Sequence, residues 1–295
     1  MIKFTKAVGL WGWRVVSFPF RARAVRGRLG RAIGRGVGLL DEGSEVVVSL
    51  TSYPRRFGQI WPAIFSILDQ RVKPGRVVLW LSREECPNEL GDVPQSVTRL
   101  MKLGLEIRFV ENNIRSYKKL LPALCEFPDS IIVTADDDAY YSRDWLGKLI
   151  EGHVRWPGAI INNPHAGARR VRVVEGEAKR VYARVAREPL FDNVVLGVGG
   201  TLYPPKCLHL DVTNVELIKR LQPKMNNDDI WFWIMAVRNG TKVKYIKGTR
   251  TNDRLPFYLT KSRQEGGLFD ENRVQNDIDI RNALAAYPDA AARLG

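Results

Sequence analysis

The chain has 295 residues, 45% of them hydrophobic, so it can bury a large core and fits one large domain with appendages better than three separate domains. Its three cysteines, Cys86, Cys125 and Cys207, are scattered, which excludes a disulfide framework and favours a reducing, cytoplasmic compartment. A formal charge of +14 implies an anionic partner, which could be nucleic acid, a membrane surface or a phosphorylated substrate.

Residues 1–43 form a basic segment that we predict to lie on an anionic membrane surface. The first 40 residues contain nine Lys and Arg and no Asp or Glu, with Trp and Phe interleaved. Arg14 and Pro19 interrupt the apolar runs before the roughly 20 residues that a spanning helix needs. A disordered basic tail, an organellar transit peptide and a nucleic-acid-binding arm remain open alternatives. Because the charge is concentrated here, we expect no nucleic-acid partner for the body.

Residues 44–249 alternate strand-like and helix-like segments. Apolar, β-branched runs predict strands over 45–53, 75–82, 105–111 and 130–138, and helical periodicity predicts helices over 58–70, 93–104 and 117–127. A helix over 142–156, with Ser142 as its N-cap and Asp144 in its first turn, and a strand over 158–164 follow. This alternation predicts an α/β fold with a mainly parallel sheet and right-handed crossovers.

Three consecutive aspartates follow the buried strand in "SIIVTADDD". In an open α/β sheet the ligand crevice lies outside the carboxyl ends of the strands, which is where these carboxylates fall. Side chains alternate along a strand, so we expect Asp136 and Asp138 on one side and Asp137 on the other. Two carboxylates on one side suit Mn²⁺ or Mg²⁺. The alternative is that the aspartates cap the next segment or pair with Lys118, Lys119 or Arg143.

Two later stretches are also informative. "GVGGTLYPP", residues 197–205, has three glycines that permit either close approach to a ligand or a plain tight turn. "NNDDIWFWIMAVRNG" predicts a buried helix, capped by Asn226 or Asn227 and ended by Gly240. Asp228 and Asp229 fall in its first turn, where the helix dipole alone would explain a pair of acids.

Five blocks in this order resemble bacterial glycosyltransferases of the GT-A fold, which use nucleotide-sugars, and in particular family-two enzymes of cell-surface polysaccharide and lipopolysaccharide synthesis. The blocks are "VVVSLTSYPRRF", "SYKKLLPAL", "TADDDAYYSRDWL", "GVGGTLYPP" and "NNDDIWFW". The resemblance covers roughly residues 44–248. It implies a Rossmann-like catalytic domain over 44–249, with residues 250–295 as a C-terminal tail or lid that ends in a helix.

The resemblance also implies roles for individual residues. Asp136 and Asp138 would hold the metal, and Asp229, with Asp228 as second choice, would be the general base. The nucleotide-sugar would contact a wider set of residues: Thr51, Tyr53, Arg55, Lys118, Lys119, Asp136, Asp137, Gly199 and Gly200. Tyr53 can stack on a uracil ring, which favours UDP. For the basic residues, Arg56 included, solvated surface is the alternative. In the tail, Lys261 and Arg263 are possible phosphate contacts.

The expected function is therefore metal-dependent transfer of a sugar from a nucleotide-sugar, with UDP as the expected carrier, to a hydroxyl group of a glycan or lipid-linked acceptor. One displacement and one base favour inversion, with retention as the open alternative, and the helix end should depress the pKa of Asp229. We expect the enzyme at the inner face of the cell membrane, as a peripheral protein. Two alternatives stay open: a metal-dependent phosphohydrolase or nucleotidyltransferase, and a noncatalytic membrane-associated binding module.

Overall fold

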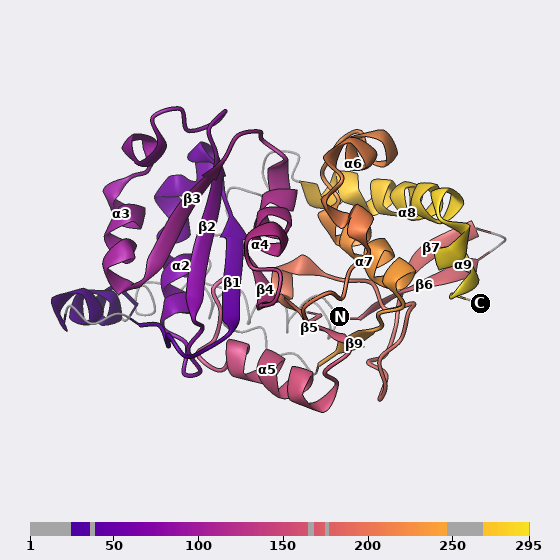
Figure 1. Ribbon diagram of the computed structural model, residues 1–295, viewed down its shortest axis with the longest axis horizontal. Coiled ribbons are helices and arrows are strands. Elements are labelled where there is room, and N and C mark those ends of the chain that lie inside the picture. The colour runs from indigo at the N-terminus through magenta and orange to yellow at the C-terminus, as the bar shows by residue number, and fades with distance from the viewer. Residues whose placement is uncertain (1–24, 36–38, 165–167, 175–176, 247–267, 295) are drawn as a thin grey trace, which may run out of the picture.

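The structure is a computed structural model that describes residues 25–35, 39–164, 168–174, 177–246 and 268–294. A single seven-stranded sheet runs through it, with helices on both faces (Figure 1). The strand order is β3-β2-β1-β4-β8-β5-β9. The strands are β1 (Val46–Thr51), β2 (Arg76–Ser82), β3 (Leu105–Val110), β4 (Ile131–Asp136), β5 (Ile160–Asn162), β8 (Thr201–Tyr203) and β9 (Val243–Tyr245).

The sheet is mixed but mainly parallel. β1 pairs in parallel with both β2 and β4, and β2 pairs in parallel with β3. Only β8 runs antiparallel to its neighbours β4 and β5. The fold class predicted from the sequence is therefore confirmed, and the carboxyl ends of β1 and β4 lie side by side, with Thr51 opposite Asp136.

Two apolar cores sandwich the sheet because side chains alternate along each strand. Val46, Val48 and Leu50 of β1 face one core, and Val47 faces the other. The first core is completed by α2 (Phe57–Leu68) and α5 (Trp145–Arg155), and the second by α4 (Leu121–Glu126) and α7 (Asp228–Asn239). The remaining helices are α3 (Gln95–Thr98), α6 (Val215–Leu221), α8 (Leu268–Ala286) and α9 (Pro288–Ala292).

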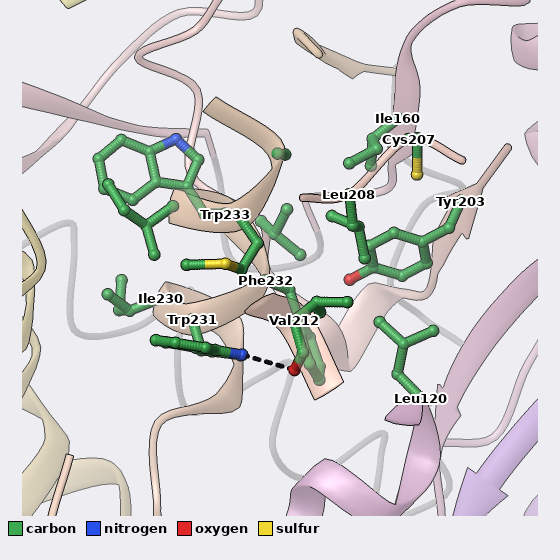
Figure 2. Close-up of a cluster of buried hydrophobic side chains, with 14 of the residues drawn as sticks. Leu120, Ile160, Tyr203, Cys207, Leu208, Val212, Ile230, Trp231, Phe232 and Trp233 are labelled. Carbon is green, nitrogen blue, oxygen red and sulfur yellow. Dashed lines mark hydrogen bonds between the residues drawn. The ribbon is translucent and has the colours of Figure 1, made fainter. Parts of the chain in front are cut away.

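Helix α7 is buried on all sides from Ile230 to Val237, as its apolar sequence predicts, and Gly240 ends it in the left-handed conformation. Its indole groups are satisfied within the core. Trp231 donates to the carbonyl oxygen of Val212 (2.9 Å; Figure 2), and Trp233 donates to that of Phe191 (2.8 Å). This packing fixes the start of α7, where the acidic pair lies, against the sheet.

Several predicted helix ends are wrong. The helix expected over 93–104 is the short α3 followed by a 3₁₀ turn, Arg99–Leu103, and the one expected over 117–127 begins with a 3₁₀ turn, Arg115–Lys119. Pro122 occupies the first turn of α4, because a proline there needs no partner for an N–H.

The predicted caps also differ from those in the structure. Helix α5 begins at Trp145, so Asp144 is the N-cap residue and Ser142 lies outside the helix. The side chain of Gln70 replaces a serine cap by accepting from the Leu146 N–H at 3.0 Å. Asn227 is the N-cap residue of α7, but its side chain donates to Asp279 of α8 at 2.8 Å.

Part of the predicted N-terminal segment, residues 1–43, is described, and it packs on the body. Residues 25–35 form a helix that packs on the body through Val25 and Leu29, which are 4% and 3% exposed. Its Arg28 pairs with Asp69 at 3.2 Å. Residues 1–24 lie outside the described residues, and so do Lys261 and Arg263. Among the described helices, none is long and apolar enough to cross a membrane.

A two-stranded hairpin that the sequence analysis did not predict stands apart from the main sheet. It consists of β6 (Arg169–Val174) and β7 (Glu177–Tyr182), which pair antiparallel. The hairpin packs on α8 (Figure 1), where the backbone N–H of Arg180 donates to Asp277 at 3.0 Å. It extends from the side of the molecule that carries α7.

Candidate functional site

Carboxylates from two distant segments meet at the carboxyl edge of the sheet. Asp136 ends β4, and Asp228 and Asp229 open α7. The ammonium group of Lys119 lies between them, 3.1 Å from Asp136 Oδ1, 2.8 Å from Asp228 Oδ2 and 3.9 Å from Asp229 Oδ1. The structure thus brings together the aspartate motif and the acidic pair that the sequence analysis had assigned to donor and acceptor.

Lys119 is the only cation of the described residues within ion-pair distance of these three carboxylates, and it is 5% exposed. Burial by itself would lower its pKa, but the attraction of Asp136, Asp228 and Asp229 together raises it well above the usual value. The lysine therefore stays charged and offsets part of the repulsion among the carboxylates. A phosphate contact, the role predicted from the sequence, would have to compete with these partners.

Asp229 is held by a backbone group as well as by charge. The N–H of Gly197 donates to Asp229 Oδ2 at 2.9 Å. A methyl group at Gly197 would lie 2.7 Å from Lys119 Nζ and 2.8 Å from Asp229 Oδ1, so a larger residue would push these two charged groups aside. The first glycine of "GVGG" therefore lets the backbone approach the carboxylate closely.

The predicted direction of the Asp229 pKa shift is wrong. Burial raises the pKa to about 7, the neighbouring charge of Asp228 adds to the increase, and Lys119 and the Gly197 N–H only partly oppose it. Loss of hydration thus outweighs the stabilisation expected from the helix N-terminus. A carboxylate with this pKa is a stronger base near neutral pH than an ordinary aspartate.

The aspartate triplet is arranged differently from a continued strand. β4 ends at Asp136, so the alternation of side chains does not reach Asp138. The buried Asp137 accepts from Ser52 at 2.6 Å and pairs with Arg56 at 2.8 Å, and the same guanidinium pairs with Asp138 at 2.5 Å. Burial raises the pKa of Asp137, with Arg56 opposing the shift. Asp137 therefore fastens the end of β4 to the loop after β1.

The fit of a divalent metal follows from the exposure of the carboxylates. Among the described residues, no group of three or more His, Cys, Asp or Glu could hold a metal ion. Asp136 and Asp138 are partly accessible, with side chains 23% and 33% exposed. One or two carboxylates completed by substrate phosphates and water is the usual way that proteins bind Mg²⁺. Asp136 pairs with Lys119 and Asp138 with Arg56, so a metal shared with a diphosphate would have to share these carboxylates with the two cations, and the two aspartates do not form a closed site.

The other predicted nucleotide contacts divide into available and engaged side chains. Tyr53 is 41% exposed and Arg55 is exposed, so both can meet a ligand. Thr51 donates to the carbonyl oxygen of Trp80 at 2.8 Å. Lys118 is 2% exposed, and its ammonium group donates to Glu85 at 2.8 Å and to Asn113 at 2.9 Å. These two contacts stabilise the buried charge, so Lys118 is engaged within the protein.

Gly199 and Gly200 pack against a side chain. The indole N–H of Trp145 donates to the carbonyl oxygen of Gly199 at 2.8 Å. Gly200 has φ +91°, and a methyl group there would lie 2.5 Å from the Trp145 ring. The close packing and the positive φ explain Gly200, as in the tight-turn alternative, and the contact of either glycine with a nucleotide-sugar stays a prediction.

Comparison with known proteins gives only a distant likeness. No protein-family model matches the chain, and no curated protein sequence matches it. Among solved structures, a Pyrobaculum calidifontis mannosyltransferase in complex with GDP-Man and Mn²⁺ is 14% identical with a TM-score of 0.44, covering 96% of this chain and 85% of that one. S. aureus TarS in complex with UDP is 14% identical with a TM-score of 0.45.

The TarS likeness covers 69% of this chain and 58% of the TarS chain, so this chain spans less than two thirds of that structure. At such TM-scores and identity, neither likeness carries an argument about this chain. The conclusions below depend on its own residues.

Proposed function

We propose that this protein is a metal-dependent glycosyltransferase that moves a sugar from a nucleotide-sugar to a hydroxyl group of a glycan or lipid-linked acceptor. One observation carries the proposal. Asp136 at the end of β4 and the acidic pair at the start of α7 all lie within 4 Å of the ammonium group of a single buried lysine, at the carboxyl end of the sheet, where α/β proteins bind ligands. Sugar transfer to a hydroxyl group requires a place for the donor phosphates next to a base that can accept a proton near neutral pH. In this proposal the aspartate motif provides the first and Asp229, whose pKa is raised, provides the second.

In this proposal Asp229 accepts the proton of the acceptor hydroxyl as that oxygen attacks the anomeric carbon. The pKa of about 7 keeps a large ionised fraction at neutral pH and still makes the carboxylate a useful base. A single displacement would invert the anomeric centre. Asp136 and Asp138 would hold the metal, which, when bound, neutralises charge on the departing nucleotide diphosphate. Tyr53, which is exposed just after the end of β1, would stack on the nucleobase of the donor, and UDP is the favoured carrier.

The donor assignment is tested by the melting temperature of the full chain with UDP-, GDP- and CMP-sugars in the presence of Mn²⁺. A ligand that binds only the folded state raises the melting temperature by mass action. We expect the largest increase with a UDP-sugar and a smaller one without Mn²⁺. A shift with a CMP-sugar alone would contradict the UDP assignment, and no shift with any of the three would contradict the proposed function.

Replacing Asp138 by asparagine tests the metal site. The substitution removes a charged ligand and leaves the diphosphate less compensated, so we expect Mn²⁺ and UDP affinity to fall together by about 10-fold or more. Calorimetry of UDP with and without Mn²⁺ measures this. The control is Asp144→Asn, because Asp144 is an exposed partner of Arg71 outside the site. If Asp138→Asn lowered UDP affinity equally without metal, Asp138 would act only through Arg56.

The cellular setting that we propose is the inner face of the cell membrane, in cell-surface polysaccharide or lipopolysaccharide synthesis. Residues 1–24 retain basic and aromatic residues suited to an anionic surface. Because Val25 and Leu29 belong to the core, a deletion should remove residues 1–24 only. We expect this variant to keep donor hydrolysis and to lose binding to anionic phospholipid vesicles in a sedimentation assay. Equal vesicle binding by the shortened protein would rule out the membrane role.

A further inference from the structure

The β6–β7 hairpin is fastened to the segment that seats Asp229. The N–H of Val194 donates to the carbonyl oxygen of Arg169 at 3.1 Å, and the Tyr245 hydroxyl lies 2.5 Å from the carbonyl oxygens of both residues. Three residues further along the chain, Gly197 donates to Asp229. The base of the hairpin is therefore joined to the site by short, direct contacts.

The register of the hairpin sorts its arginines onto two faces, since residues opposite each other in an antiparallel pair share a face. Arg180 lies opposite Val171, and Arg169 opposite Tyr182, which places Arg180 and Arg169 on the same face. The other face carries Arg170 and Arg172. Both of these have a counter-charge in Asp192, at 3.9 Å and 3.3 Å respectively.

Arg180 has no such counter-charge within the described part of the chain. Its guanidinium group forms no hydrogen bond and no ion pair with another described residue, although the side chain is half-buried. The nearby Asp277 instead accepts from the backbone N–H of Arg180. Burial lowers the pKa of Arg180 and the charge of Arg169 adds to the decrease, whereas the attraction of Asp229 and Asp277 opposes it. A half-buried charge without a partner is costly, which favours a ligand as its counter-ion.

We infer that Arg180 binds an anionic group of the acceptor, a phosphate or a carboxylate, beside Asp229. The inference rests on the proposed function for the identity of that ligand as the acceptor. The hairpin that carries Arg180 is joined to the segment in which Gly197 holds Asp229, and Asp229 also attracts the Arg180 charge, so we assign Arg180 to the acceptor side. A guanidinium group can grip either anion through two parallel hydrogen bonds.

The test is calorimetry on the full chain with saturating UDP and Mn²⁺, so that the donor site is filled. The probes are inorganic phosphate, glucose 6-phosphate, glucuronate and glucose. We expect the wild type to bind the anionic probes and not glucose, and Arg180→Gln to lose about 10- to 100-fold in affinity for them. Arg180→Lys keeps the charge and should lose less. Arg172→Gln is the matched control, because Arg172 lies on the other hairpin face, and it should bind as the wild type does.

The outcomes separate this inference from the proposed function. Equal binding of the anions by Arg180→Gln and the wild type, or no binding by the wild type, would overturn the inference even where UDP-sugars bind. Preference for phosphate or for glucuronate identifies which anion the site takes. A fall in UDP affinity in Arg180→Gln, with folding intact, would overturn the assignment to the acceptor and make Arg180 a donor contact. If no nucleotide-sugar stabilises the protein while Arg180 still binds phosphate, the proposed function fails and the anion site stands.

Discussion

Replacing Asp229 by asparagine is expected to lower the turnover number by about 10²- to 10⁴-fold, the usual contribution of a positioned general base. Asparagine keeps the size of the side chain and cannot accept the proton. Donor binding should stay near the wild-type level, because Asp229 is seated by Gly197 and Lys119 on the acceptor side of the site. A transfer assay run beside calorimetry of UDP with Mn²⁺ measures both quantities.

The pH profile provides a second readout of the same residue. The base must be ionised, and burial raises its pKa to about 7, so wild-type turnover should rise with pH and level off above that value. The effect of pH on stability has the opposite direction: the contribution of Asp229 to the free energy of unfolding decreases as pH rises. A folded-state pKa of about 7 against an ordinary 3.8 means that the folded chain binds this proton more tightly, so its contribution falls as pH rises between these values. Asp229→Asn should therefore melt no lower than the wild type at pH 8.

The matched comparison is Asp228→Asn, which changes the adjacent carboxylate of the same pair. Asp228 lies 2.8 Å from the ammonium group of Lys119 and is 7% exposed, so Asp228→Asn removes one member of a buried ion pair. We expect it to lower the free energy of unfolding more than Asp229→Asn does, and to lower turnover less. Normal turnover by a well-folded Asp229→Asn would show that Asp229 is not the general base and only interacts favourably with the N-terminus of α7. The base would then be sought at Asp228.

The strands and the position of the site were predictable because they depend on local patterns. The apolar runs before Thr51 and Asp136 specify buried parallel strands, and the carboxyl ends of such strands adjoin one another. The buried helix α7 was predictable for the same reason, since Ile230 to Val237 has no polar face to expose.

The features that escaped prediction depend on partners far away in the sequence. Lys119 carries no local sign that its ammonium group will meet Asp228 and Asp229, more than a hundred residues later. The raised pKa of Asp229 follows from burial, which only the packed fold defines. Likewise Ser142 satisfies the sequence rule for an N-cap, but Gln70 of a distant segment accepts the N–H instead.

The hairpin escaped prediction for a different reason. Its two strands, "RRVRVV" and "EAKRVY", are short, charged and isolated from the main sheet, so they lack the apolar run that identifies a buried strand. Arg180 therefore resembled ordinary surface charge in the sequence. Only the register of the pair and the absence of an ion-pair partner among the described residues set it apart from Arg172.

Replacing Lys119 by methionine is expected to have the largest effect on stability, a loss of about 3 to 5 kcal/mol in the free energy of unfolding. Methionine fills most of the volume but removes the cation that three carboxylates share. Asp136, Asp228 and Asp229 would then repel one another with no cation between them, and Asp228 would do so while largely shielded from water. Urea denaturation at pH 8, where these groups are most ionised, measures the loss, and the loss should shrink toward pH 5 as Asp229 takes up a proton.

Lys118→Met is the matched control, since it makes the same substitution in the adjacent buried lysine. Lys118 has a single carboxylate partner, Glu85, so its removal leaves no group of like charges close together. We expect a smaller loss of stability and an unchanged pH profile of turnover. In folded Lys119→Met the profile should instead move to higher pH, because the lysine lowers the pKa of Asp229. Equal stability losses and unchanged profiles in both variants would show that Lys119 only fills space, and that the acidic groups of β4 and α7 act independently.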